Sequence, residues 1–172
     1  KIKGVSFFRS VYFMPSMISV AIMGVIFSYL FSHESGIVNG IIKALGGTGV
    51  KWFSNRWTAL VTVMIASIWQ NFGINMLFFM TGLQSISPEM YEASEIDGAS
   101  NTRQFFSITL PYMLFVTTPQ MITTFVGNIN NFNVIYLLTT GGPLTLDYYQ
   151  AGKTDLLVTW LYKLTVNEQN YS

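Results

Sequence analysis

The 172-residue sequence contains no cysteine and one histidine, and few of its residues are charged. The lack of cysteine excludes disulfides and thiolate metal sites, and one histidine excludes the usual histidine clusters. Charged residues make up 10% of the chain, far below the roughly one quarter that is usual in soluble domains. The net charge of +1 argues against nucleic acid as a partner. These deficits indicate that the chain has lipid rather than water as its main solvent.

Charge is missing altogether from three long runs of the sequence, which are residues 10–32, 57–88 and 104–146. A helix that crosses about 30 Å of hydrocarbon needs roughly 20 residues, so each run is long enough to span a membrane.

We therefore predict an all-α fold of polytopic membrane helices, in one transmembrane domain over residues 1–172. The predicted spans are about 11–31, 57–83 and 111–138. Pro15 and Pro119 fall inside the first and third spans, where each removes a helical hydrogen bond and favours a kink. Three spans with this much polar content form a thin bundle, so we expect further helices or a partner chain against them.

The loop between the first two predicted spans contains one short apolar piece, GIVNGIIKAL, flanked by glycine, serine and asparagine. A short helix of this kind is typical of a segment that lies in the membrane interface, and we predict that role for it.

Half of the eight acids are gathered in residues 89–97, between the second and third predicted spans. Ser87 and Pro88 suit the start of a helix, where the helix dipole favours the acid Glu89. The pair Asp97-Gly98 is typical of a turn, in which Gly98 adopts a left-handed conformation. A second amphipathic piece, NTRQFFSITL, runs into the third span. The pattern predicts a helix, a glycine turn and a second helix across the membrane surface.

These residues resemble the cytoplasmic loop of the permease subunits of binding-protein-dependent ABC importers. The family pattern is Glu-Ala-Ala, three residues, Gly, nine residues, Ile, one residue, Leu-Pro, and every spacing is kept here. Ser94 replaces the second alanine and is still small. The resemblance implies that loop 88–110 is a coupling helix that docks on an ATPase subunit. The implied coupling residues are Glu92, Ala93, Ser94, Glu95, Asp97, Gly98, Ile108, Leu110 and Pro111.

The resemblance extends over most of the chain, through the segments FFRSVYFMP, SIWQNFGINM, NNFNVIYLLTTGGP and AGKTDLLVTWLYKLT. These segments look like the carbohydrate branch of the family, and the last two are most similar to the larger maltose or maltodextrin permease subunit. The chain would then be a partial permease core, with helices before its first span and after its third. The implied orientation puts Lys1 and the acidic loop inside the cell, and residues 33–56 and 141–172 outside.

A subunit of this kind is expected in a prokaryotic plasma membrane as a multi-pass protein surrounded by lipid. The implied partners are a second permease subunit, two ATPase subunits, an extracellular sugar-binding protein and the sugar. The chain itself would be no enzyme and would hold no cofactor or metal, because ATP and Mg²⁺ bind to the ATPase subunits.

Uncharged polar side chains inside the predicted spans fit a sugar path, because sugars are bound by amides, hydroxyls and aromatic faces. At 100° per residue, Gln120, Thr124, Asn128 and Asn131 share one broad side of a helix. The second span adds Trp69, Gln70, Asn71 and Asn75. In the maltose-type family these two spans hold the sugar at mid-membrane, and Asn128 and Asn131 match that pattern.

The positions in the second span depart from the maltose pattern, which leaves the sugar open. Asn and Gln also hydrogen-bond between membrane helices, so the amides are alternatively contacts that hold the bundle together, and Trp69 is alternatively a packing residue. An alternative function is an ion-coupled secondary transporter of a small polar solute, which needs acids or broken helices in its spans.

Overall fold

The structure is a computed structural model that describes residues 4–146 and 149–167. These residues are helical, apart from connecting loops and an isolated bridge between Leu144 and Gly152, so the all-α prediction is confirmed for them. The helices are α1 (Val5–Phe13), α2 (Val20–Leu30), α3 (Ile37–Ala44), α4 (Arg56–Gln84), α5 (Pro88–Ile96), α6 (Asn101–Gln104), α7 (Leu110–Ile129), α8 (Phe132–Thr139) and α9 (Leu157–Tyr162). The predicted entry at Lys1 lies outside the described residues.

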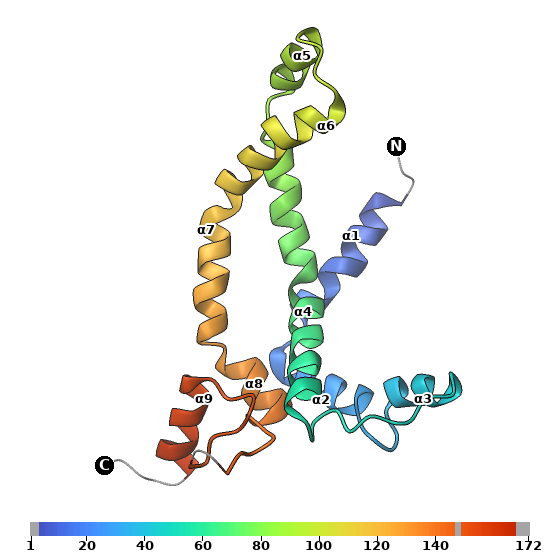
Figure 1. Cartoon of the computed structure of the whole chain (residues 1–172), viewed down its shortest axis with the longest axis vertical. Helices are drawn as coiled ribbons and strands as arrows, with labels where there is room; N and C mark the ends of the chain where they lie inside the picture. The colour runs from blue at the N-terminus through green and yellow to red at the C-terminus, as the bar shows by residue number, and fades with distance from the viewer. Residues whose placement is uncertain (1–3, 147–148, 168–172) are drawn as a thin grey trace.

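Two long helices dominate the molecule and are long and apolar enough to cross a membrane. One is α4, and the other runs without a break from Asn101 to Ile129 through α6, a π-helical turn (Phe105–Thr109) and α7. The two contact each other, and Figure 1 shows them as the two uprights of the fold. The second half of the predicted coupling loop is therefore the first part of this long helix.

The first predicted span, 11–31, is broken rather than straight. Its two limbs, Phe7–Met17 and Val20–Leu30, are bent by 99°. Pro15 lies in a single 3-10 turn and has no N–H to donate, and Ile18 is extended with φ −78° and ψ 131°. Ser19 then starts α2 by accepting a hydrogen bond from the Ile22 N–H at 3.4 Å. A bend in the first predicted span is confirmed, but it lies at Ile18 and Ser19, three residues after Pro15, and it is sharp enough to separate two helices.

The third predicted span, 111–138, is shorter in the structure, where the helix ends at Ile129. Asn130 terminates α7, and the Asn131 side chain accepts a hydrogen bond from the Val134 N–H at 3.3 Å to begin α8. Asparagine competes with the helical backbone for hydrogen bonds and favours caps, which explains the break. The helix continues through Pro119.

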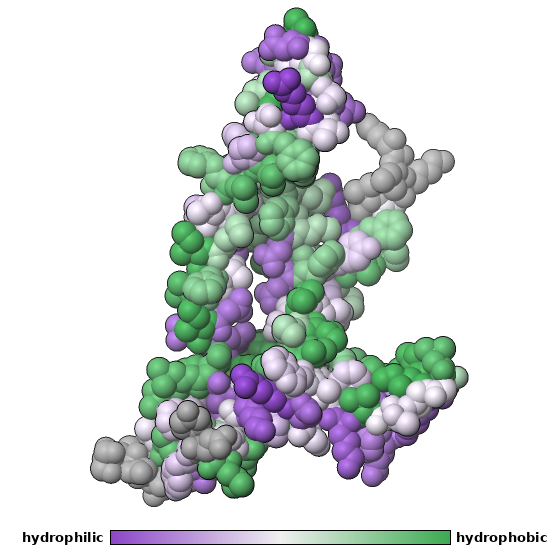
Figure 2. All heavy atoms as spheres, viewed as in Figure 1, coloured by the Kyte–Doolittle hydropathy of each residue, from purple (hydrophilic) through white to green (hydrophobic). Residues whose placement is uncertain are grey.

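The apolar core is small and lies at the end of α4 that begins with Arg56. It is formed where α2, α4 and α8 meet, around the buried residues Met23, Phe27, Ala66 and Val134. Most other side chains of the long helices are exposed, and in α7 the buried ones are Met113 and Thr117. Figure 2 accordingly shows hydrophobic residues over much of the outer surface of α7. These exposed faces fit contact with lipid or with other membrane helices.

The segment after α8 is held by a buried ion pair. The Lys163 Nζ lies 2.7 Å from the Asp155 Oδ2, and the two side chains are 9% and 4% exposed. The Asp155 carboxylate also accepts hydrogen bonds from the Gly152 N–H and the Thr159 hydroxyl. These contacts tie α9 to the loop that follows Gly141.

Candidate functional site: a polar cleft and an acidic helical loop

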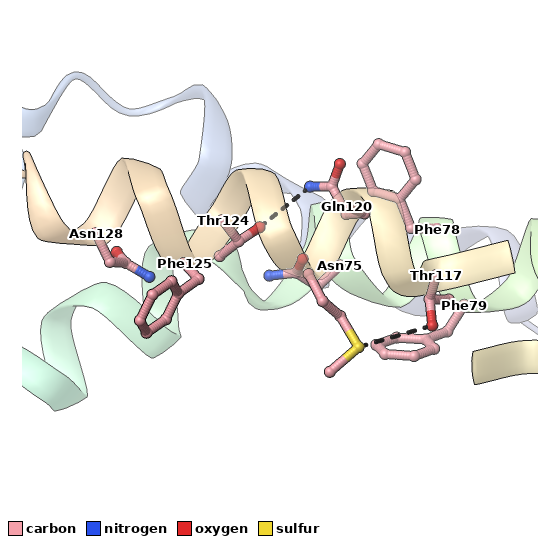
Figure 3. A pocket seen from close by; sticks show the side chains of 9 residues that line it. Asn75, Phe78, Phe79, Thr117, Gln120, Thr124, Phe125 and Asn128 are labelled. Carbon is pink, nitrogen blue, oxygen red and sulfur yellow. Dashed lines mark hydrogen bonds between the residues drawn. The ribbon is translucent and has the colours of Figure 1, made fainter. Parts of the chain in front are cut away.

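A cleft of about 280 Å³ lies between the two long helices. On the α7 side, polar lining residues recur about once per helical turn, at the 3.6-residue period of the helix. They are Thr117, Gln120, Thr124 and Asn128. Its α4 wall is contributed by Asn75 and two phenylalanines. Figure 3 shows these side chains around one hollow. The full lining is Asn75, Phe78, Phe79, Thr117, Gln120, Met121, Thr124, Phe125 and Asn128.

The lining offers hydrogen-bonding groups but no charge. Gln120 Nε2 donates to Thr124 Oγ1 at 3.4 Å, and Asn75 Nδ2 donates to the Asn71 carbonyl at 3.0 Å. Within the described residues, no side-chain hydrogen bond of Asn128 is found, so its amide is available to a ligand. Phe78 and Phe125 add aromatic faces to the same hollow. Such a surface suits an uncharged polar solute.

A second hollow of about 400 Å³ adjoins the cleft along α4. Asn75 and Phe79 line both, and Asn71 lines the second. The Asn71 amide donates to the Ser67 carbonyl at 2.9 Å. Figure 2 shows hydrophilic residues gathered in the space between the two long helices. The structure therefore brings Asn71, Thr124 and Asn128 into two joined hollows.

Three other residues predicted for the path lie outside these hollows. Gln70 Nε2 donates to the Ile18 carbonyl at 3.1 Å, which is one of the groups freed at the bend between α1 and α2. The Trp69 ring packs on Phe27, with ring centroids 5.4 Å apart. Asn131 caps α8, so the prediction that it shares a helix face with Asn128 is wrong. Gln70 and Trp69 therefore make contacts between helices, which was the alternative to a role in the sugar path.

Several lining residues were not predicted from the sequence. Thr117 lies three residues before Gln120, and Phe125 lies three residues before Asn128. Residues three apart share one side of a helix, so the helical spacing from Gln120 and Asn128 was the signal that could have identified them. Phe78 and Phe79 on α4 carry no comparable signal, because nearly every position of that span is apolar or aromatic.

The acidic loop forms the far tip of the molecule beyond the two long helices (Figure 1). The predicted order of helix, glycine turn and helix is confirmed, and Gly98 has the left-handed φ of +75°. No residue of α5 is buried, and Glu92, Glu95 and Asp97 are exposed. Ala93 is exposed too, so a broad face of α5 is open to contact.

Hydrogen bonds across the glycine turn hold α5 against the start of the long helix. The buried Gln104 donates through Nε2 to the Ser94 hydroxyl at 2.9 Å, and the Tyr91 and Thr109 hydroxyls are 2.7 Å apart. Ser94, the one departure from the family pattern, is thus part of this contact. Ile108 and Leu110 are half-buried, and Pro111 is exposed.

A family model described as "Binding-protein-dependent transport system inner membrane component" matches residues 3–163. The Maltose/maltodextrin transport system permease protein MalF of Klebsiella aerogenes is 38% identical over 164 residues, which cover 95% of this chain and 32% of that protein. The protein of the same name from Escherichia coli K12 is 41% identical over 154 residues, covering 89% and 29%. The chain thus spans about a third of the length of these relatives.

A chain in the crystal structure of a bacterial ABC transporter that imports the acidic polysaccharide alginate has a similar fold. The TM-score is 0.75 at 20% identity, covering 99% of this chain and 58% of that one. A second structure, of the alginate transporter with a pentasaccharide-bound periplasmic protein, gives a TM-score of 0.73 at 20% identity and covers 96% and 56%. At this identity the likeness concerns the fold.

Proposed function

The chain belongs to the family of binding-protein-dependent transport system inner membrane components, and from this we propose that it is part of a permease subunit of an ATP-driven sugar importer. The 38% identity to a maltose/maltodextrin permease over 95% of the chain supports the carbohydrate branch of the family. The solute is a sugar or an oligosaccharide, and the chain gives it a path through the membrane.

The observation that carries the proposal is the uncharged polar cleft between α4 and α7. A sugar presents hydroxyls that exchange hydrogen bonds with amides, and apolar ring faces that stack on aromatic side chains. Asn75, Gln120 and Asn128 supply the amides, and Phe78 and Phe125 supply the aromatic faces. An ionic substrate would leave its charge unpaired in this cleft, which is costly at membrane depth.

The exposed acidic loop supports coupling to a separate ATPase. In this proposal Glu92, Glu95 and Asp97 contact cations on an ATPase subunit, and Gly98 sets the angle between α5 and the long helix. Closure of the ATPase subunits then moves α5, and the long helix carries that motion to the cleft. ATP and Mg²⁺ bind to the ATPase subunits, and this chain forms no bond with the solute.

The complete importer contains a second permease subunit, two ATPase subunits and an extracellular sugar-binding protein. The binding protein delivers the sugar at the end of the molecule that holds α3 and α9, opposite the acidic loop. The chain lies in the plasma membrane of a prokaryote with its acidic loop in the cytoplasm.

Asn128→Ala in the complete transporter tests the cleft as a sugar site. Loss of one hydrogen bond of about 0.5–1.5 kcal/mol should raise the sugar concentration at half-maximal uptake by up to about tenfold. Uptake is measured in proteoliposomes with saturating ATP. Val126→Ala is the control, because Val126 is exposed, lies two residues away on α7 and lines neither hollow.

The opposing outcome is an unchanged half-saturation concentration with a lower melting temperature, which would make Asn128 a contact between helices. Uptake that needs an ion gradient and no ATP would instead support the ion-coupled secondary transporter.

A further inference from the structure

Helix α3 has an apolar face that no described residue covers. Ile37, Ile41 and Leu45 are 63%, 57% and 83% exposed. They are spaced by four residues, so they lie along one side of the helix. Isolated exposed apolar residues are ordinary, but three in register make a continuous stripe.

The opposite face of α3 is fixed to the rest of the molecule. Asn39 is fully buried, and its Nδ2 lies within hydrogen-bond distance of three carbonyls, the shortest being that of Val50 at 2.9 Å. Its Oδ1 accepts from the Val50 N–H at 2.9 Å and from the Trp52 indole N–H at 3.1 Å. Val38 packs against the core cluster. The apolar stripe is therefore held outward in a defined orientation.

The orientation of α3 relative to the membrane spans follows from the figures. Figure 1 shows α3 projecting sideways from the fold at the level where α4 begins. Figure 2 shows the hydrophobic side of this projection turned toward the level of the spans and its hydrophilic side turned away. Trp57, 71% exposed at the start of α4, marks the same level, because tryptophan is enriched at membrane interfaces. The Arg56 guanidinium lies 5.6 Å from the centre of its ring.

The segment that carries α3 is rich in cations, with Lys43 in the helix, Lys51 in the following loop and Arg56 at the start of α4. Lys43, Lys51 and Arg56 are exposed, and Glu34 is the one acid in residues 33–56. A basic polar side with an apolar stripe is the pattern of helices that bind in the plane of anionic membranes.

We propose that α3 lies flat in the membrane surface, with Ile37, Ile41 and Leu45 among the upper acyl carbons and the cations at anionic lipid headgroups. The apolar stripe supplies the insertion, and the headgroup contacts keep this end of α4 at a fixed depth. The interaction goes beyond the proposed sugar import, because it holds whatever solute crosses the membrane.

Two spin labels on α3 of the complete transporter test this placement. One is attached at Ile41→Cys and the other at Lys43→Cys, two exposed positions about 200° apart around the helix. The 172-residue sequence has no native cysteine to remove. Any cysteine in the rest of the transporter is replaced by serine. The transporter is placed in nanodiscs of phosphatidylcholine and phosphatidylglycerol, and collisions with oxygen and with Ni-EDDA are compared by EPR.

The Ile41 label should collide with oxygen more than with Ni-EDDA, because oxygen concentrates in lipid, and the Lys43 label should show the reverse ratio. The proposal is overturned if Ni-EDDA reaches both labels equally, which means water, or if neither reagent reaches the Ile41 label, which means a covering protein. If the Ile41→Cys variant does not assemble into the transporter, a label at Leu45→Cys on the same stripe replaces it. Omitting phosphatidylglycerol should move the Ile41 ratio toward water, and an unchanged ratio would overturn the role of anionic headgroups.

Discussion

Glycine at two helix crossings lets backbones approach more closely than any other residue allows. A Cβ added at Gly73 would overlap the Tyr12 carbonyl, and one added at Gly24 would lie 2.8 Å from the Leu137 carbonyl oxygen. Small residues at such contacts are the usual means by which membrane helices associate. The bend of the first span against α4 and the packing of α2 on α8 thus each depend on one missing side chain.

Gly73→Ala should destabilise the protein by about 1–3 kcal/mol, because α1 and α4 must separate to admit the methyl group. The expected result is a lower melting temperature of the purified transporter, measured by nanoscale fluorimetry. Gly127→Ala is the control, since a Cβ there meets nothing within 4 Å and alanine favours the helix. Equal melting temperatures for the two variants would show that the crossing is loose.

The buried ion pair of Asp155 and Lys163 gives a second prediction. Lys163→Met leaves the carboxylate buried without its cation, and removal of one partner of such a pair costs about 3–5 kcal/mol. The melting temperature should fall, and the double variant Asp155→Asn with Lys163→Met should recover much of the loss. A single variant as stable as the native protein would mean that water reaches the carboxylate freely.

At the scale of helices and loops, the sequence predicted the elements that have local signals and missed those that do not. The order of helix, Gly98 turn and helix was predictable, because Pro88, Asp97-Gly98 and the acid at the helix start are local signals that the structure keeps. The end of α7 was not predicted, because the uncharged run continues past Asn131 and hydrophobicity alone does not show where a helix turns. Asparagine caps at 130 and 131 were the available signal.

The broken first span is a second case in which the sequence did not show where a helix ends. Pro15 indicated a kink, but the bend lies three residues later, where the Gln70 amide of α4 donates to the Ile18 carbonyl. A contact between residues so far apart in the sequence gives no local signal. The cleft was likewise half predictable. Its α7 wall follows the period of polar residues, whereas its α4 wall is fixed by how the two helices pack, and Gln70 and Trp69 turn elsewhere.

Gly98→Val should leave the protein inserted but weaken coupling. A β-branched residue at φ +75° costs about 1–2 kcal/mol or more, which favours a different angle between α5 and α6. Nothing lies within 4 Å of an added Cβ, so the effect comes from the backbone. ATPase activity stimulated by the binding protein is the measurement. Gly98→Asn, which tolerates the left-handed region, should keep most of the stimulation, and equal stimulation in both variants would contradict a fixed turn.

The whole molecule is an open framework whose long helices expose most of their surface. Such faces are stable only against lipid or other membrane helices, in agreement with a chain that covers about a third of the length of its relatives. The acidic tip and the loops around α3 and α9 lie at opposite ends of the molecule (Figure 1). The polar cleft is lined by α4 and α7, the long helices that join these ends. In the proposed importer these ends meet the ATPase and the binding protein.

Uptake of labelled oligosaccharides by the complete transporter in proteoliposomes tests the central claim most directly. ATP is enclosed or omitted, and the sugar-binding protein is added or left out. We predict that at least one oligosaccharide accumulates only when ATP and the binding protein are both present, and that the loaded binding protein stimulates ATP hydrolysis. Accumulation that persists without ATP and follows an ion gradient, or a transporter that moves only charged solutes, would contradict the account.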